Sequence, residues 1–332
     1  MNILQKSFVL DGCIFADGDF RGCAPDVANS GLNAFFLTVP YSTEGSREAA
    51  RAIARIHRLA DDPHQGLRVI RNCQDLTKAK EAGEIGLILW FQDPHPVENS
   101  LELLRVFYEL GVRTMQLTYN RANYLGTGST EEKDRGLTEF GAEVIAEMNH
   151  LGMVIDLSHS SKQTALDAMR ESKHPVLFSH ANPRALTDSP RNKDDEELKL
   201  LAEQGGVVGL TPWGPLCWKG IGRPSLDDYI DHIEYVINLI GVDHVGFGSD
   251  NTADHSSDTA GTEEQSALYP GVVAEYNRAV GTDPSIRHAE GFSGPHDLAN
   301  LVEGLKRRDF SDSDIGKLLG GNFLRVFKDV WK

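Results

Sequence analysis

The chain has 332 residues, of which 40% are hydrophobic and 25% charged, and its formal net charge is −16. This composition is typical of a folded globular protein, and the acidic balance argues against nucleic acid or anionic membrane as a partner, because phosphate groups bind to basic surfaces. No apolar run approaches the ~20 residues that span a bilayer, and the first residues lack the pattern of a signal peptide.

Eight short runs rich in β-branched and apolar residues predict strands along the chain. They cover residues 7–15, 31–40, 85–92, 112–119, 153–159, 175–180, 206–213 and 244–250. Amphipathic segments between several of these runs predict helices, because their apolar residues recur at helical spacing. The clearest cover residues 100–111, 138–152, 194–206 and 225–241.

Strands that alternate with helices predict parallel βαβ units. We expect one α/β domain over residues 1–332, folded as a single (β/α)8 TIM barrel, since eight parallel strands close such a barrel. A doubly wound open sheet is the alternative, but the turn after the first run lacks the GxGxxG sequence of that fold. The polar segment 251–294 follows the eighth strand, and we expect this extended loop to form a lid or substrate loop.

The four cysteines are scattered without CxxC spacing. They are Cys13, Cys23, Cys73 and Cys217. This pattern predicts reduced thiols rather than a disulfide framework, and with the absent signal sequence it indicates a cytoplasmic protein.

The carboxyl ends of the predicted strands should converge, because a TIM barrel builds its active site there. The residues at those ends are Cys13 or Phe15, Gln92, Tyr119, His159, His180, Trp213 and Asp250. Two successive runs, "VIDLSH" and "VLFSH", end in Ser-His. Neutral imidazoles from adjacent strands can share one divalent metal ion, and Asp250 could face them across the mouth. Alternatively, each histidine only caps its strand by bonding to a loop carbonyl.

Arg191 follows the sixth strand in "PRNKDDEEL". Its forked guanidinium could bind a substrate carboxylate, or it could pair at the surface with Asp194 or Asp195. The ten other histidines lie in predicted helices or polar loops, where we expect them to be solvated. They are His57, His64, His95, His150, His174, His232, His244, His255, His288 and His296.

Several blocks together resemble the membrane (renal) dipeptidase family of metal-dependent amidohydrolases. They are "LRVFYELGVRTMQLTYNRANYLGTG", "GLTEFGAEVIAEMNHLGMVIDLSHSS", "PVLFSHANPRALTDSPRN", "GGVVGLTPW", "HVGFGSDN" and "NFLRVF". The resemblance implies a barrel with a metal site at its strand ends that hydrolyses dipeptides or related small amides. It also implies that His159 and His180 bind one metal ion, that Arg191 binds the terminal carboxylate of the substrate, and that Asp250 relays the proton.

The chain departs from the family pattern at four positions. Cys13 stands where typical members carry a histidine and Phe15 where they carry an aspartate, while Gln92 replaces the bridging glutamate and Tyr119 a substrate-binding histidine. The combination resembles that of a bacterial branch of the family with the same losses. Two adjacent divalent ions need anionic bridging ligands, so we expect at most one zinc ion and possible loss of metal altogether. Cys13 could supply a thiolate or simply pack in the strand; we group it with Gln92, Tyr119 and Arg191 as substrate-binding positions.

We therefore expect a dipeptidase-like metallohydrolase that cleaves a dipeptide or another small carboxylated amide through a metal-bound water, at a mononuclear or degenerate site. Its expected partner is a small-molecule substrate with a free carboxylate, and a homodimer is left open. The alternatives are a catalytically lapsed homologue that binds a small carboxylated ligand, and a lyase-type enzyme on the same barrel, because a fold does not determine its chemistry.

Overall fold

The structure is a computed structural model that describes residues 2–15, 30–40, 45–252 and 271–332. A parallel sheet runs in the order β10-β1-β2-β4-β5-β6-β7-β8-β9, with β3 paired to β4. Its strands are β1 (Leu10–Phe15), β2 (Ala34–Thr38), β3 (Leu67–Val69), β4 (Ile85–Phe91), β5 (Val112–Gln116), β6 (Val154–Asp156), β7 (Leu177–Phe178), β8 (Val207–Leu210), β9 (Val245–Phe247) and β10 (Asn251–Thr252). Each of the eight predicted runs contains one of these strands, and the (β/α)8 barrel is confirmed. The sequence missed the short strands β3 and β10.

The barrel closes between its last and first strands. Strand β10 follows β9 almost directly and pairs with β1, where Asn251 lies opposite Ile14. The buried carboxylate of Asp11 adds a second link, because its Oδ1 accepts hydrogen bonds from the backbone N–H groups of Ser249 (2.8 Å) and Cys13 (3.0 Å). The ends of β9 and β1 are therefore held side by side.

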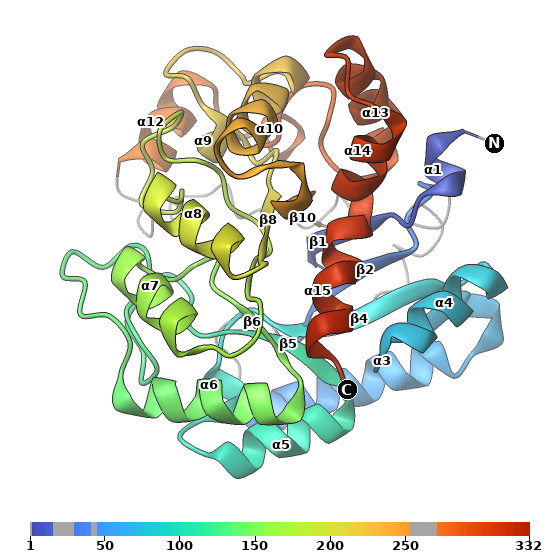
Figure 1. The fold of residues 1–332 in the computed structure, drawn as a ribbon, viewed down its shortest axis with the longest axis vertical. Helices are drawn as coiled ribbons and strands as arrows, with labels where there is room; N and C mark the ends of the chain where they lie inside the picture. Colours follow the sequence, from blue (N-terminus) through green and yellow to red (C-terminus); the bar gives the residue numbers. More distant parts are fainter. Residues whose placement is uncertain (1, 16–29, 41–44, 253–270) are drawn as a thin grey trace.

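Helices surround the strands (Figure 1). They are α1 (Ile3–Lys6), α3 (Ser46–Ala60), α4 (Cys73–Ala82), α5 (Leu101–Leu110), α6 (Glu139–Leu151), α7 (Lys162–Glu171), α8 (Asp195–Glu203), α9 (Gly214–Cys217), α10 (Leu226–Ile240), α12 (Val272–Ala279), α13 (Leu298–Arg307), α14 (Asp312–Gly316) and α15 (Asn322–Val330). The four predicted helices correspond to α5, α6, α8 and α10. Among the described residues, no helix is both long and apolar enough to cross a membrane.

Helix α5 shows how local sequence sets these elements. The Ser100 hydroxyl accepts a hydrogen bond from the Leu103 N–H and caps the first turn. The helix ends at Gly111, whose φ of 113° lies in the left-handed region that glycine adopts without strain. Leu104 and Phe107, one helical turn apart, are buried. The sequence pattern therefore determines both the ends and the inner face of this helix.

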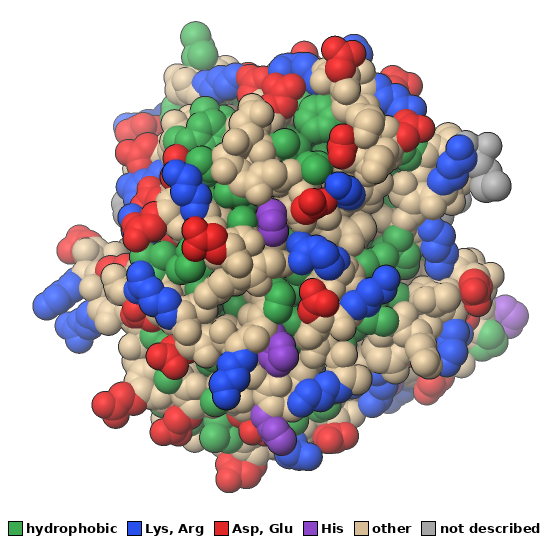
Figure 2. Space-filling model, in the orientation of Figure 1, with side chains coloured by type: hydrophobic (Ala, Val, Ile, Leu, Met, Phe, Trp, Pro, Cys, Tyr) green, Lys and Arg blue, Asp and Glu red, His purple; other side chains and the backbone are tan. Residues whose placement is uncertain are grey.

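Helix α15 covers the end of the barrel where the strands begin (Figure 1). Phe323 packs among interior residues of the barrel, including Leu177 and Val207. The Asn322 side chain donates to the Val245 carbonyl at 2.7 Å, and Arg325 donates to the Gly205 carbonyl at 2.6 Å. On this face, acidic and basic side chains of the described residues are interspersed (Figure 2). Because this end is plugged, the opposite end is left for a functional site.

Two long connections, one before β4 and one after β9, contain secondary structure of their own. Segment 45–84 contains α3, β3 and α4. Of the expected lid, 251–294, residues 253–270 lie outside the described part of the chain, and the rest contains α12. After α12 the chain returns to the barrel mouth, where His288 forms a bridge with Trp213 at the end of β8.

Candidate active site

The two Ser-His segments meet at the mouth of the barrel. The Nε2 atoms of His159 and His180 lie 2.9 Å apart, and both rings are buried. Both strands end earlier than the sequence suggested, so each histidine lies just beyond its strand. After β6, the Asp156 carboxylate accepts the Ser158 N–H at 3.0 Å, which turns the chain out of the sheet.

Asp156 also explains why a serine precedes each histidine. Its carboxylate accepts hydrogen bonds from the hydroxyls of Ser158 (2.7 Å) and Ser179 (2.5 Å) and from the Ser179 N–H (3.1 Å). Because the Ser179 hydroxyl donates to Asp156, its oxygen remains free to accept the Nδ1–H of His180 at 2.9 Å. This chain of hydrogen bonds leaves the Nε2 of His180 as an unprotonated lone pair that faces the mouth.

His159 is oriented by the loop after β5. Its Nδ1–H donates to the Asn120 side-chain oxygen at 2.8 Å, and the Tyr119 ring stacks on the imidazole at a centroid distance of 4.2 Å. Burial lowers the pKa of His159 well below its usual value and that of His180 to about 4. Both rings are therefore neutral near pH 7, and their Nε2 atoms lie within hydrogen-bond distance of each other.

Cys13 and Asp250 lie on the opposite side of the mouth. The Cys13 thiol donates to Oδ1 of Asp250 at 3.4 Å, and one ligand atom from each of Cys13, His180 and Asp250 lies within 4.8 Å of the others. Burial opposes ionisation of Asp250, but His180 and the guanidinium groups of Arg287 and Arg191 outweigh it and lower its pKa. The backbone φ of Asp250 is 52°, a left-handed conformation that aspartate tolerates better than most residues.

The surroundings of Cys13 are acidic. Burial and the neighbouring charges of Asp250 and Asp11 raise the pKa of the Cys13 thiol well above its usual value. Burial also raises the pKa of Asp11 to about 7, and its Oδ2 has no hydrogen-bond partner among the described residues. A cation in this part of the mouth would offset a concentration of negative charge.

The donor set fits one divalent ion. Two neutral imidazoles, a carboxylate and a thiol are the donor types that zinc binds, in tetrahedral sites. It does not fit a carboxylate-bridged pair of ions, because the residue after β4 is the neutral Gln92, which is buried, and position 15 at the end of β1 is a phenylalanine.

Arg191 is buried behind the two histidines. Its guanidinium donates to the carbonyl of Ser158 and, at 3.1 Å, to that of His180, while its Nε–H has no hydrogen-bond partner among the described residues. The alternative of a surface pair with Asp194 or Asp195 is wrong, because only 1% of Arg191 is exposed. The guanidinium connects the ends of the two Ser-His segments and keeps one donor available.

A second buried cation lies nearby. Lys193 Nζ donates to the Ser160 carbonyl at 2.8 Å, lies 3.5 Å from the Glu197 carboxylate and sits over the Phe178 ring. Burial lowers the pKa of Lys193 and raises that of Glu197. This ion pair fastens the start of α8 to the loop that carries His159.

Two histidines that were expected to be solvated are buried. His288 lies at the mouth, with its Nε2 3.2 Å from the Asp250 carbonyl, because the chain after α12 returns there. His232 lies on the inner face of α10, and neither ring nitrogen has a hydrogen-bond partner among the described residues. Its spacing from Tyr229 and Val236 along that face was the signal that could have placed it inside.

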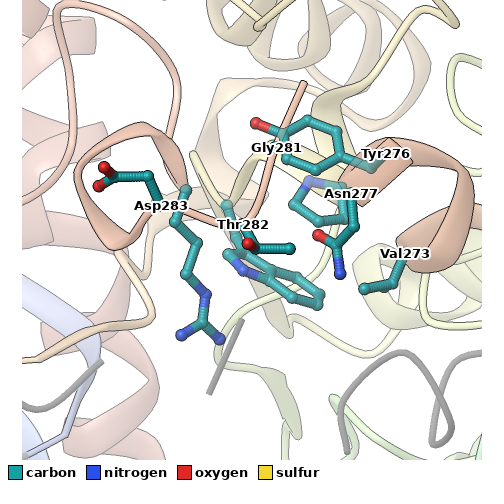
Figure 3. Close-up of a pocket in the computed structure, with 9 residues that line it drawn as sticks. Val273, Tyr276, Asn277, Gly281, Thr282 and Asp283 are labelled. Carbon is teal, nitrogen blue, oxygen red and sulfur yellow. The ribbon is translucent and has the colours of Figure 1, made fainter. Parts of the chain in front are cut away.

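A pocket adjoins the mouth beside α12 (Figure 3). Its lining residues are Trp213, Pro215, Val273, Tyr276, Asn277, Gly281, Thr282, Asp283 and Arg287. The Arg287 guanidinium lies over the Trp213 ring, 5.4 Å from its centroid. Since Arg287 directly precedes His288, one short segment contributes to both the pocket and the site.

Sequence reasoning found the two histidines and Asp250 but missed the residues that orient them. Asp156 and Ser179 belong to the same two motifs as the histidines, and Asn120 follows Tyr119 at the end of the neighbouring strand. The signal for all three was a polar residue within a few positions of a strand end. The structure places Gln92 directly after β4, where its side chain is buried.

Comparisons with known proteins identify the family to which this chain is similar. Residues 27–288 match the family model of membrane dipeptidase (peptidase family M19). An uncharacterized dipeptidase of Schizosaccharomyces pombe is 38% identical over 210 residues, which cover 61% of this chain and 50% of the relative. A dipeptidase of Clonostachys rogersoniana is 28% identical over 305 residues, or 90% of this chain and 74% of the relative. A crystal structure of an amidohydrolase from Pseudomonas aeruginosa has a TM-score of 0.87 and 36% identity, covering 99% of this chain and 98% of that one. The chain thus spans half the length of the first of these relatives.

Proposed function

This chain belongs to the membrane dipeptidase family, and we propose that it is a metal-dependent hydrolase of dipeptides or other small amides that carry a free carboxylate. The observation that carries the proposal is the pair of neutral imidazoles whose Nε2 atoms lie 2.9 Å apart, with the Asp250 carboxylate and the Cys13 thiol close to His180. We propose zinc as the ion, with at most one bound per chain, because the donors suit zinc and a bridging carboxylate is missing at positions 15 and 92.

Each site residue has a role in this proposal. His159 and His180 would hold the ion, and Ser179 and Asn120 would accept their Nδ1–H groups so that both Nε2 atoms are left for the ion. A bound zinc ion lowers the pKa of water and polarises a carbonyl. Asp250 accepts the proton of the attacking water and passes it to the leaving amine.

The substrate carboxylate needs a cationic partner. Arg191 offers one, through the Nε–H that is left without a partner among the described residues. Tyr119 and Gln92, at the ends of β5 and β4, are proposed to line the rest of the substrate site. This arrangement favours small substrates with one terminal carboxylate.

The test is a hydrolysis screen in the presence of added zinc, manganese or cobalt. Dipeptides and N-acyl amino acids are compared with the same compounds in which the carboxylate is amidated. We expect hydrolysis of the free acids with one equivalent of metal and little or none of the amidated compounds. Equal rates for both sets would contradict the carboxylate contact, and two equivalents of tightly bound metal would contradict the single-ion site.

A second candidate is an inactive homologue that binds a small carboxylated ligand. It is favoured by the neutral Gln92 and by Cys13 at positions where the family pattern has metal ligands. Absence of hydrolysis with all three metals, together with binding of N-acyl amino acids in calorimetry, would establish it instead.

We also propose a cytoplasmic location. It is supported by the acidic composition and by the free thiols of Cys13, Cys73 and Cys217 among the described residues. Cell fractionation with an antibody against the chain tests it, and recovery in an extracytoplasmic fraction would contradict it.

A further inference from the structure

We propose that Cys13 is a metal ligand, so that the mouth holds a single ion through one sulfur and two imidazole nitrogens, with the Asp250 carboxylate beside them. This inference rests on the proposed metal dependence and adds to it a ligand that replaces a histidine of the family pattern. If Cys13 is a ligand, the site has exchanged one metal ligand for another; if it is not, the site has only lost a ligand.

The positions of the donor atoms support this assignment. Cys13 Sγ, a carboxylate oxygen of Asp250 and a ring nitrogen of His180 lie within 4.8 Å of one another, and His159 Nε2 lies 2.9 Å from His180 Nε2. Zinc at ~2.0–2.1 Å from nitrogen and ~2.3 Å from sulfur places neighbouring tetrahedral ligands roughly 3.3–3.8 Å apart. Cys13, His180 and Asp250 are therefore close enough to contact one ion after modest side-chain movements, and His159 adjoins this cluster through His180.

Charge balance gives an independent reason. The two imidazoles are neutral, with their Nδ1–H groups already donated to Asn120 and Ser179. A divalent ion on these two rings alone would be a buried, uncompensated charge, which is costly. One thiolate and one carboxylate offset two positive charges. Binding in this form releases the thiol proton to solvent, which leaves the thiolate bonded to the ion.

The contact of Cys13 also differs from that of a packing cysteine. Cys217, which is equally buried, donates its thiol to the Thr211 backbone carbonyl at 3.0 Å. The Cys13 thiol instead donates to the Asp250 carboxylate. Strand β1 is irregular between Asp11 and Ile14, which is the stretch that contains Cys13. The sulfur is thus directed toward the mouth rather than only into the apolar interior.

The experiment is a titration of the metal-free full chain with cobalt(II) chloride under anaerobic conditions, followed by absorption spectroscopy. We expect a sulfur-to-cobalt charge-transfer band in the near ultraviolet that saturates at one equivalent. Cys13→Ser should lose the band, and its cobalt affinity should fall by at least the ~10–100-fold that loss of an outer hydrogen-bond partner costs a metal site. Cys73→Ser, which alters a half-buried cysteine on α4, is the matched control and should keep both.

The possible outcomes separate the two proposals. If cobalt binds at one equivalent without the band, or if Cys13→Ser retains the band, Cys13 is not a ligand, whereas the proposed hydrolase stands. If no cobalt or zinc binds, both fail. X-ray absorption at the zinc edge of the unmodified protein gives the same decision without a variant, since a sulfur ligand appears at ~2.3 Å. A shell of only nitrogen and oxygen would overturn the assignment even if Cys13→Ser did not fold.

Discussion

The two halves of the barrel mouth are built differently. Between β6 and β7, Asp156 accepts hydrogen bonds from two serine hydroxyls and two backbone N–H groups, and His180 donates to one of those serines. Between β9 and β1, Asp11 Oδ2 has no hydrogen-bond partner among the described residues, and the Cys13–Asp250 contact is long at 3.4 Å. One half is a saturated hydrogen-bond network, whereas the other contains ligand atoms to which a cation could bind.

This difference suggests how the ligands of the metal site can vary within the family while the two histidines are kept. The network around Asp156 orients His180 and the Asn120 side chain orients His159, both from behind, so these orientations do not depend on which ligands face the imidazoles. The residues on the β1 and β4 side can therefore vary while the two histidines stay in place. We expect changes to the first half to affect stability and metal affinity, and changes to the second half to affect metal affinity and turnover.

The largest effect is expected for Asp250→Asn. The substitution removes the carboxylate that moves the proton, and general acid–base catalysis typically contributes ~10²–10⁴-fold. We expect kcat for a hydrolysed dipeptide to fall by about that factor. The control is Asp243→Asn, which alters an exposed carboxylate at the opposite end of the barrel, paired with Lys317. A kcat for Asp250→Asn within a few-fold of the unmodified protein would show that another group moves the proton.

The next effect tests the buried ion pair beside the saturated half. Lys193→Met leaves Glu197 as a buried carboxylate without its cation, and breaking such a pair typically costs ~3–5 kcal/mol. We expect that loss in the free energy of unfolding from urea titration, with partial recovery in the double variant Lys193→Met, Glu197→Gln. Lys162→Met breaks an exposed ion pair and should cost no more than ~1 kcal/mol. Equal effects of the two single variants would contradict the difference between buried and exposed pairs.

A smaller effect is expected from the hydrogen bond behind His180. Ser179→Ala removes the acceptor of the Nδ1–H, and loss of such a partner typically lowers metal affinity by ~10–100-fold. Competition with a chromogenic chelator measures it. Ser160→Ala is the control, because the Ser160 hydroxyl bonds to Thr118 rather than to either imidazole. Unchanged affinity in Ser179→Ala would mean that packing alone orients the ring.

The smallest effect concerns a buried polar group outside both halves. Burial lowers the pKa of His232 to about 4, whereas the unfolded value is near 6.5. The unfolded state therefore binds more protons than the folded state between these values, so stability is full above pH 6.5 and falls as the pH drops toward 4.

His232→Leu should remove the His232 contribution to this pH dependence and stabilise the protein at neutral pH by ~1–3 kcal/mol, because two unpaired polar nitrogens are lost. Urea unfolding at pH 5 and pH 7.5 measures both effects. His150→Leu, at an exposed position of α6, should leave the pH dependence as it is. If His232→Leu destabilised the protein at both pH values, the ring would have to make a favourable contact.

The sequence predicted the barrel well because its strands and helices are marked locally. The ends of α5, for example, follow from Ser100 and Gly111. It failed for β6 and β7, whose predicted runs extended to the histidines. Asp156 ends β6 early by accepting the Ser158 N–H, and a run of apolar residues does not reveal that side-chain contact. Arg191 was ambiguous for a similar reason, since its burial depends on the carbonyls of two other segments.

By itself, the sequence determined the order of strands and helices, the placement of His159 and His180 at neighbouring strand ends, and the loss of carboxylates at positions 15 and 92. These features depend on residue type and on spacing over a few positions. Only the tertiary structure decided that the two Nε2 atoms face each other, that His288 reaches the mouth, and that the Cys13 thiol meets Asp250. The last contact joins residues 237 positions apart, and it exists because β10 and the Asp11 carboxylate close the barrel between β9 and β1.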